Sequence, residues 1–169
     1  EFTSAGNRAG ARVSMKGGIG KDGTLVALLT ELEKYGGLGE GAHGRQPYIY
    51  SVQKRCTKGF GVLTHTDGSR AMRAPGHPQA SFAMESMLDE LSYKAGLDPL
   101  EVRKLNLKNE AYQRQLERVA KEIGWAAHPN KTAPGKPEGR WCTGIGFGVS
   151  VWGGGGGPAC EVDVHIECD

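Results

Sequence analysis

Several chemistries are excluded by what this sequence lacks. None of its four cysteines forms a Cys-x-x-Cys pair, so we expect no zinc or iron–sulfur site within the chain and assign no metal ligand. No apolar run approaches the roughly 18 residues that a membrane-spanning helix needs, so no membrane span is expected. Because the net charge is only +2 and the basic residues are spread along the chain, nucleic-acid binding has no support.

Motifs of common enzyme classes are missing as well. The sequence has neither a Gly-x-Ser-x-Gly elbow for a serine hydrolase nor a His-Glu-x-x-His zinc motif. The glycine runs at 17–20 and 153–157 do not predict phosphate-binding loops, because no Lys-Ser or Lys-Thr follows either of them. From the residues alone, no complete enzyme active site can be assembled.

Glycine is abundant, and its distribution is informative. The chain has 27 glycines in 169 residues without a three-residue period, which indicates many turns or a backbone that approaches a ligand closely. A chain of this length is one domain by default, and its thiols are expected to be reduced, as in a cytosolic protein. Because the chain starts at Glu1 and stops at Asp169 within an alternating stretch, we interpret it as a fragment of a longer or divided polypeptide.

The order of elements predicts an α+β fold with a mixed or antiparallel sheet and three helices grouped on one side. Gly20 to Gly23 is a strong turn signal and favours a hairpin, although residues 24–34 also have the propensity of a helix. We expect strands at 8–16, 24–33, 48–57, 141–152 and 160–168, and helices at 80–95, 99–107 and 112–124.

Three regions follow from this order. Residues 1–125 hold the hairpin, a turn and the helices, residues 126–139 form a proline-rich linker, and residues 140–169 form a second β-hairpin. Helical spacing predicts the buried faces of the first and third helices, which comprise Phe82, Met84, Met87, Leu88 and Leu91, and Leu116, Val119, Ala120 and Ile123, respectively.

The most informative local feature is the turn Arg73-Ala74-Pro75-Gly76, which leads into the first helix. Prolines and a glycine fix its backbone, and a helix beginning near Pro78 would point four N–H groups back toward it. With the cation of Arg73 at its mouth, this geometry suits an anionic or oxygen-rich ligand. The simpler alternative is a tight connection carrying a surface arginine.

Two other groups of residues are weaker candidates for a site. His43 and Arg45 lie in a glycine-rich loop that either faces a ligand or is only exposed. His165 with Glu167 or Cys168 could be drawn as a metal site, but strict alternation along residues 160–168 is typical of the solvent face of a strand.

Resemblance to a known family adds what composition cannot. The turn Arg73-Ala74-Pro75-Gly76-His77-Pro78-Gln79, the helix after it, and Gly96-Leu97-Asp98-Pro99 followed by Glu101, Arg103 and Asn106 resemble the molybdenum-binding subunit of the xanthine dehydrogenase and aldehyde oxidase family. The upstream hairpin and the segment Arg140 to Gly146 are similar too, so the resemblance runs through nearly the whole chain.

This resemblance implies a part of a larger molybdenum-binding domain. Family members oxidise an aldehyde or an N-heterocycle with water as the oxygen source, and a glutamate acts as the base. The implied cofactor is a molybdenum–pterin (molybdopterin or its cytosine dinucleotide), with iron–sulfur clusters and FAD on partner domains or subunits. By the same resemblance, Arg73, Ala74, Pro75 and Gly76 would contact the cofactor, and the location would be cytoplasmic, or periplasmic through a partner subunit.

Two departures from the family pattern set further expectations. Pro75 stands where xanthine-oxidising members carry an aromatic residue, so an aldehyde or a heterocycle other than a purine is favoured. The family's base glutamate and its second glycine-rich pterin motif have no match in these 169 residues, so we assign no catalytic residue and expect the isolated chain to be inactive. The alternative is a binding or scaffold module that keeps the fold without the chemistry.

Overall fold

The structure, a computed structural model, describes residues 8–37, 49–70, 72–127, 139–141 and 144–151. Three strands, β1 (Gly10–Ile19), β2 (Leu25–Tyr35) and β3 (Lys54–Val62), form one sheet in the order β1-β2-β3. β1 and β2 are antiparallel, whereas β3 runs parallel to β2, so the sheet is mixed as expected. The hairpin prediction for the first two strands is confirmed.

The hairpin turn is closed by local polar contacts. The N–H of Gly20 donates to the carbonyl of Thr24 at 2.8 Å. The carboxylate of Asp22 accepts from the Thr24 N–H and from its hydroxyl at 3.0 and 2.8 Å, which keeps the pKa of that carboxyl below its usual value. The Gly20-Lys21-Asp22-Gly23 signal therefore encodes this turn through short-range hydrogen bonds.

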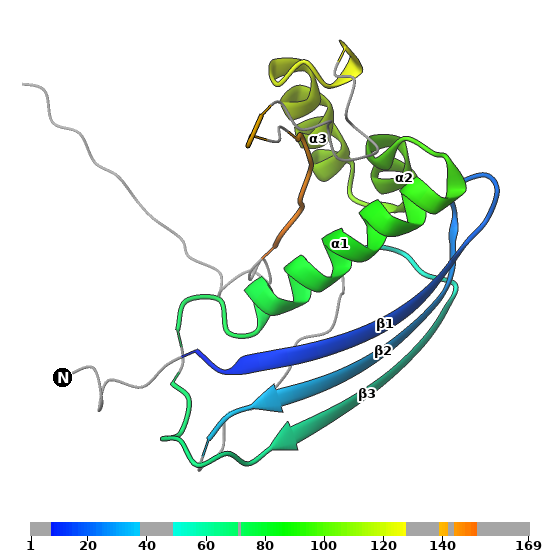
Figure 1. The fold of residues 1–169 in the computed structure, drawn as a ribbon. Coiled ribbons are helices and arrows are strands. Elements are labelled where there is room, and N and C mark those ends of the chain that lie inside the picture. Colours follow the sequence, from blue (N-terminus) through cyan, green and yellow to red (C-terminus); the bar gives the residue numbers. More distant parts are fainter. Residues whose placement is uncertain (1–7, 38–48, 71, 128–138, 142–143, 152–169) are drawn as a thin grey trace, which may run out of the picture.

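The helices follow as α1 (His77–Ala95), α2 (Pro99–Asn106) and α3 (Glu110–Glu122), with a short 3-10 turn at Trp125–Ala127. α1 lies across one face of the sheet, and in this view α2 and α3 lie above α1, on the same side of the sheet (Figure 1). Gly96 ends α1 in the left-handed conformation, and Asp98 caps α2. The predicted fold class, α+β with three helices grouped on one side, is confirmed.

The core lies between α1 and the sheet and extends under α2 and α3. Gly17 permits the close approach of α1 to β1, because a Cβ there would stand 2.7 Å from Leu91 Cδ1. Leu28 lies opposite Gly17 on the same face of the sheet and is buried. The other buried apolar residues of this core are Leu25, Tyr50, Met84, Leu88, Leu100, Val102, Leu107, Leu116, Ala120, Trp125 and Phe147.

The predicted helix faces are only partly right. Phe82 is 77% exposed, and Val119 and Ile123 are also exposed, so their assignment to the core is wrong. Glu85 is buried instead, because the buried face of α1 is centred on Met84, Glu85 and Leu88 and the carboxylate has partners there. Periodicity gives the spacing of a helix face, whereas its centre depends on residues elsewhere in the chain.

Two strand predictions also need correction. The third strand begins at Lys54 rather than at residue 48, because the N–H groups of Ser51 and Gln53 donate to Asn106 and Leu25 outside the ladder. Described residues 144–151 form no strand, since their polar contacts go to side chains of α1 and α2. The predicted strand at 160–168 and residues 128–138 of the predicted linker at 126–139 lie outside the described residues.

Candidate cofactor-binding turn

The turn before α1 has an unusual backbone. Ala74 has φ 56°, and it is the one non-glycine residue with positive φ within the part of the chain that the structure describes. Gly76 has φ 76° and immediately precedes the helix. An L-residue in the left-handed region costs about 1–2 kcal/mol, and a residue that precedes proline is further restricted to extended conformations. The conformation of Ala74 is therefore held by its surroundings.

The first turn of α1 offers fewer N–H groups than the sequence predicted. Pro78 has no N–H, and the N–H of His77 donates to the Ala74 carbonyl at 3.1 Å. The predicted set of four free helix donors is therefore wrong. Within the described residues, the N–H groups of Ala74 and Gly76 have no hydrogen-bond partner. Ala74 is half-buried and Gly76 is buried, so the Ala74 N–H is the more accessible donor of the turn.

The side chains of the turn leave it accessible. Arg73 and Pro75 are exposed, and Arg73 forms no ion pair within the described residues. Two unpartnered backbone donors beside a free guanidinium can bind oxygen atoms of an anionic ligand. Oxygen atoms of a phosphate or bound to a metal accept hydrogen bonds from such donors, so the chemistry of the turn is compatible with the implied cofactor.

The segment before β1 holds the turn from one side. The Arg8 guanidinium donates to the carbonyls of Arg73 and Ala74, at 2.6 and 3.2 Å. The Gln79 side-chain amide donates to the Ala9 carbonyl at 2.8 Å. The Gln79 Oε1 atom is buried and has no hydrogen-bond partner among the described residues, which makes it an orphaned acceptor close to the turn.

Residues 144–151 reach the turn from the other side. The Val151 carbonyl lies 2.6 Å from His77 Nδ1, which fixes this ring nitrogen as the donor, and the hydroxyls of Ser150 and Ser81 are 2.9 Å apart. In Figure 1 this segment passes from α3 to the start of α1. Two segments from opposite ends of the described chain therefore meet at the same turn.

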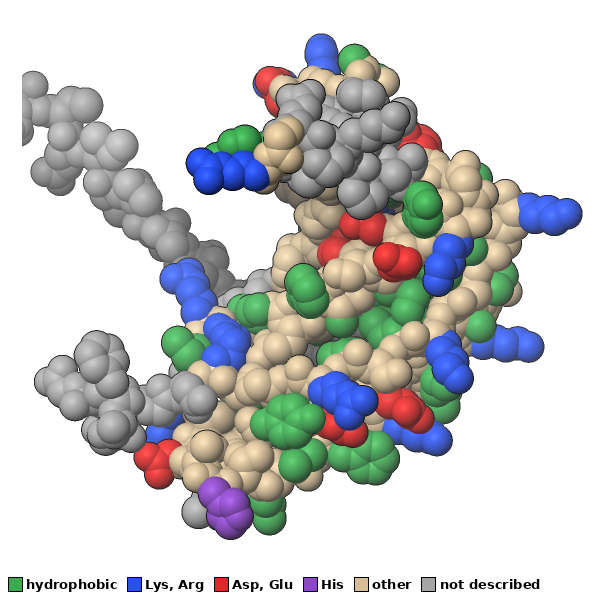
Figure 2. Space-filling view, viewed as in Figure 1, with side chains coloured by type: hydrophobic (Ala, Val, Ile, Leu, Met, Phe, Trp, Pro, Cys, Tyr) green, Lys and Arg blue, Asp and Glu red, His purple; other side chains and the backbone are tan. Residues whose placement is uncertain are grey.

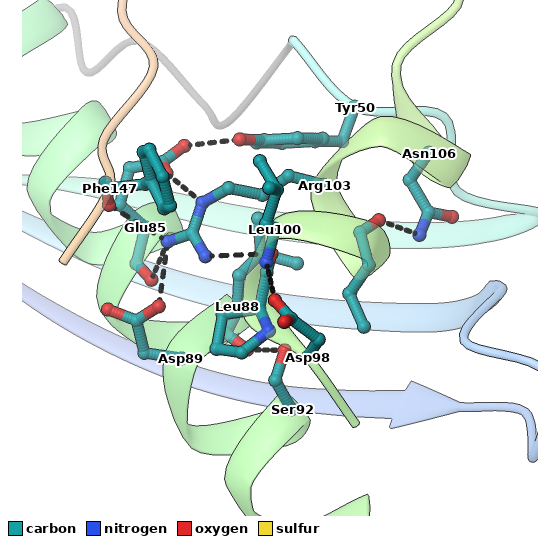
Figure 3. A network of polar contacts seen from close by, with 12 residues as sticks. Tyr50, Glu85, Leu88, Asp89, Ser92, Asp98, Leu100, Arg103, Asn106 and Phe147 are labelled. Atoms are coloured by element: carbon teal, nitrogen blue, oxygen red, sulfur yellow. Dashed lines mark hydrogen bonds and ion pairs between the residues drawn. The ribbon is translucent and has the colours of Figure 1, made fainter. Parts of the chain in front are cut away.

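A buried polar network anchors residues 144–151 at their middle (Figure 3). Arg103 is fully buried; its Nε lies 2.8 Å from Glu85 Oε2 and its Nη2 lies 2.8 Å from Asp89 Oδ1. The same guanidinium donates to the Phe147 carbonyl at 3.1 Å, and the Tyr50 hydroxyl donates to Glu85 Oε1 at 2.8 Å. This network joins α1, α2 and two loops in one place.

Burial is the largest cause of the pKa shifts of Tyr50 and Glu85, two members of the network. It raises the pKa of the Tyr50 hydroxyl above its usual value, and the charge of Glu85 adds to this shift. Burial also raises the pKa of Glu85, while Arg103 and Tyr50 oppose that rise. The hydrogen bonds of both groups lie within the network and not at the turn, so the network positions segments and is not a candidate catalytic group.

The residues that carried the family resemblance in α2 have scaffold roles. Asp98 accepts from the N–H of Leu100 at 2.8 Å and from the Trp125 indole at 3.0 Å. Asn106 accepts from the Leu25 N–H and donates to the Gly23 carbonyl, which ties α2 to the β1–β2 hairpin. Their spacing carried the family resemblance, but only the structure gives their contacts, because Trp125, Gly23 and Leu25 are distant from them in sequence.

An apolar groove of about 420 Å³ opens between β1 and α1, beginning at Gln79. Val13, Phe82 and Met87 contribute to its walls, and Figure 2 shows hydrophobic surface between these elements. Its lining offers few polar groups, so it does not suit the polar atoms of a pterin cofactor.

The remaining predicted sites give no further candidates. Among the described residues, no group of three or more His, Cys, Asp or Glu side chains could hold a metal ion, and no helix is long and apolar enough to cross a membrane. Cys56 is a free, exposed thiol. The loop with His43 and Arg45, and the stretch with His165, Glu167 and Cys168, lie outside the described residues.

The fold of this chain is shared with segments of solved oxidoreductases. It is similar to the aldehyde oxidoreductase from Desulfovibrio gigas, with a TM-score of 0.64 and 24% identity, over 72% of this chain and 16% of that one. Quinoline 2-oxidoreductase from Pseudomonas putida 86 gives a TM-score of 0.59 at 19% identity, over 69% and 18% of the two chains. The fold is thus that of a segment of these oxidoreductases.

Sequence comparison then gives the family. Residues 1–107 match the molybdopterin cofactor-binding domain, and the chain belongs to this family. It is 29% identical over 162 residues to a probable xanthine dehydrogenase subunit of Bacillus subtilis, covering 85% of this chain, and 34% identical over 110 residues to the aldehyde oxidoreductase of Megalodesulfovibrio gigas, covering 60%. The expected family and its molybdenum–pterin cofactor are confirmed.

The chain spans only a small part of these relatives. It covers 22% of the length of the Bacillus subtilis protein and 12% of that of the Megalodesulfovibrio gigas protein.

Proposed function

We propose that this chain is a segment of a molybdenum hydroxylase and forms one wall of its cofactor site through the turn Arg73-Ala74-Pro75-Gly76. The parent enzyme oxidises an aldehyde or an N-heterocycle. It works in the cytoplasm, or in the periplasm through a partner subunit, and passes electrons to iron–sulfur clusters and FAD on partner domains or subunits. The remainder of the molybdenum subunit completes the site.

The observation that carries this proposal is the donor set of the turn. The unpartnered N–H of the half-buried Ala74 and the exposed guanidinium of Arg73 supply a hydrogen bond and positive charge to an oxygen-rich group. The molybdenum–pterin group, when bound, supplies the two-electron oxidation with water as the oxygen source. The residues of this chain bind and orient that group, and the base that moves the proton comes from elsewhere in the subunit.

The substrate class follows from Pro75. Its exposed ring lacks the flat π-surface that an aromatic side chain would present to a purine, so the turn provides less stacking for a bicyclic substrate. We expect the assembled enzyme to have a higher kcat/KM for aromatic aldehydes than for xanthine, measured with a dye as electron acceptor. A preference for xanthine would contradict this assignment.

The cofactor role is tested by Arg73→Met, with Arg70→Met as the matched control. Both arginines are exposed and lie three positions apart, so neither change should alter folding. In the enzyme produced with its partner subunits, Arg73→Met removes a charge-assisted contact, and we expect bound molybdenum and pterin to fall about tenfold at limiting cofactor. The control should retain both.

Metal analysis and fluorescence of the oxidised pterin measure this occupancy. Full occupancy in Arg73→Met would reject the turn as a cofactor wall and would favour the alternative of a scaffold module. The 169-residue chain produced alone should hold no stoichiometric molybdenum; stoichiometric metal together with turnover would disprove the need for the rest of the molybdenum subunit.

A further inference from the structure

The turn Arg73–Gly76 is held by two residues that lie 65 or more positions apart from their partners in the sequence. The two ends of the Arg8 guanidinium donate to two successive carbonyls, those of Arg73 and Ala74, at 2.6 and 3.2 Å. Gln79, on the first turn of α1, donates to the carbonyl of Ala9 at 2.8 Å. In Figure 1 the loop before α1 passes beside the start of β1. The segment Arg8–Ala9 is thereby bonded to both sides of the turn.

A local sequence cannot hold this turn by itself. Ala74 has φ 56° and precedes a proline, and each of these facts alone disfavours its conformation. Its carbonyl accepts two hydrogen bonds, from Arg8 Nη1 and from the His77 N–H at 3.1 Å. An isolated Met-Arg-Ala-Pro-Gly segment would favour the extended region for Ala74, so the contacts with Arg8 add to the His77 bond in holding the observed state.

The contacts between Arg8 and the turn also set the direction in which the Ala74 N–H points. The described residues contain no cis peptide bond, and in a trans peptide the C=O and the following N–H point to opposite sides. Because Arg8 binds the carbonyl of Arg73, the N–H of Ala74 points away from Arg8. That N–H has no partner within the described residues, so it is presented on the open side of the turn.

The positive charge of Arg8 also favours an anionic ligand at the turn. Arg8 forms no ion pair within the described part of the chain and contacts only neutral carbonyls, so its positive charge remains uncompensated beside the turn. Together with Arg73 it raises the local positive potential, which favours an anionic group.

We propose that Arg8 is a positioning residue of the cofactor site: with Gln79 it clamps the turn and aims the Ala74 N–H at an oxygen of the bound cofactor. This inference rests on the proposed function of the turn. It adds a residue that touches no cofactor and acts only through the backbone of Arg73 and Ala74.

The test compares Arg8→Met, Arg8→Lys and the control Arg12→Met in the enzyme purified with its partner subunits. Arg12 is 76% exposed and its nearest carboxylate, Glu33, is 4.0 Å away, so its replacement should change nothing. Lysine keeps the charge of Arg8 but cannot bind two carbonyls in the fork geometry of a guanidinium. It should therefore give an intermediate result.

Two measurements separate the clamp from general stability. Hydrogen exchange of the His77 amide, which is bonded to the Ala74 carbonyl, should accelerate about tenfold in Arg8→Met, and the melting temperature should change little. The Mo(V) electron paramagnetic resonance signal of the loaded enzyme should shift or broaden, because a hydrogen bond to the cofactor has moved. Arg12→Met should match the wild type in both measurements.

The outcomes distinguish this inference from the proposed function. If Arg73→Met loses the cofactor but Arg8→Met leaves both the His77 exchange and the Mo(V) signal unchanged, the clamp is refuted and the cofactor wall stands. If Arg8→Met accelerates the exchange without any change in the signal while Arg73→Met keeps full occupancy, the turn does not face the cofactor and both proposals fail.

Discussion

Several polar or charged side chains of this protein are buried in its interior, which is unusual for such residues. Thr30, Lys34, Ser92 and Arg103 are buried almost completely. Burial lowers the pKa of the Lys34 ammonium and raises the pKa of the Tyr50 hydroxyl, so both shifts favour the neutral form. The pH dependence of stability follows from such residues.

Tyr50 predicts a loss of stability at alkaline pH. The unfolded chain releases the tyrosine proton near pH 10, whereas the folded state, with its raised pKa, keeps it. Between the tyrosine pKa of the unfolded chain and the higher pKa of Tyr50 in the folded state, the free energy of unfolding should fall as pH rises, by at most about 1.4 kcal/mol per pH unit. Tyr50→Phe should flatten this slope in urea unfolding between about pH 9 and 11.

Tyr93→Phe is the matched control, since Tyr93 is 58% exposed. It should retain the wild-type slope above about pH 10. An equal slope in wild type and Tyr50→Phe would show that the Tyr50 hydroxyl titrates alike in the folded and unfolded chains.

Elements are joined in this fold by side chains at their ends. Asn106, the last residue of α2, donates to the Val102 carbonyl within its own helix and bonds to Gly23 and Leu25 in the hairpin. Its own carbonyl accepts from the N–H of Ser51. Asn106 thus ties the end of α2 to the hairpin turn, to the start of β2 and to the loop before β3.

Asn106→Ala should therefore destabilise the chain by about 3 kcal/mol, because it leaves the buried Leu25 N–H and Gly23 carbonyl without partners. Asn109→Ala is the control: Asn109 only caps α3, through the Ala111 N–H at 2.9 Å, and should cost about 1 kcal/mol. Urea unfolding at neutral pH measures both, and equal losses would argue against the linking role of Asn106.

The sequence predicts elements well where their signals are local. The Asp22-Gly23 turn, Gly96 and the Asp98-Pro99 cap each act within a few residues, and the elements they bound lie close to the predicted ranges. The burial of Glu85 could not be predicted, because its partner Arg103 is 18 residues away. Likewise the parallel pairing of β3 depends on contacts between distant segments.

In the candidate site, too, features with a local sequence signal could be predicted, and features that depend on distant contacts could not. Proline and glycine identify the turn Arg73–Gly76, and the family resemblance supplies its expected ligand. The left-handed Ala74 and the clamp by Arg8 leave no local signal, since nothing at residues 8 and 9 distinguishes them from any loop before a strand. The strand prediction for the extended segment 144–151 is wrong because small alternating residues suit both states.

At the scale of the whole molecule, one buried cation holds distant parts together. Arg103 in α2 contacts Glu85 and Asp89 in α1 and the carbonyl of Phe147, and through Glu85 it reaches Tyr50. The segment that begins at Phe147 continues to Val151, beside His77. Stability and the approach of this segment to the turn therefore depend on the same guanidinium.

Arg103→Met should cost about 3–5 kcal/mol in urea unfolding, because it leaves the Glu85 carboxylate buried without its cation. Arg118→Met is the control, since Arg118 lies 2.8 Å from Glu122 but is 77% exposed, and it should cost less than about 1 kcal/mol.

Adding Glu85→Leu to Arg103→Met should recover part of the loss, because the unpaired charge is removed. Hydrogen exchange along residues 144–151 should stay fast in the double variant, since the bond to the Phe147 carbonyl and the bond from the Val149 N–H to Glu85 are both absent. If exchange there returned to the wild-type rate, the segment would be held by packing alone and Arg103 would act only on stability.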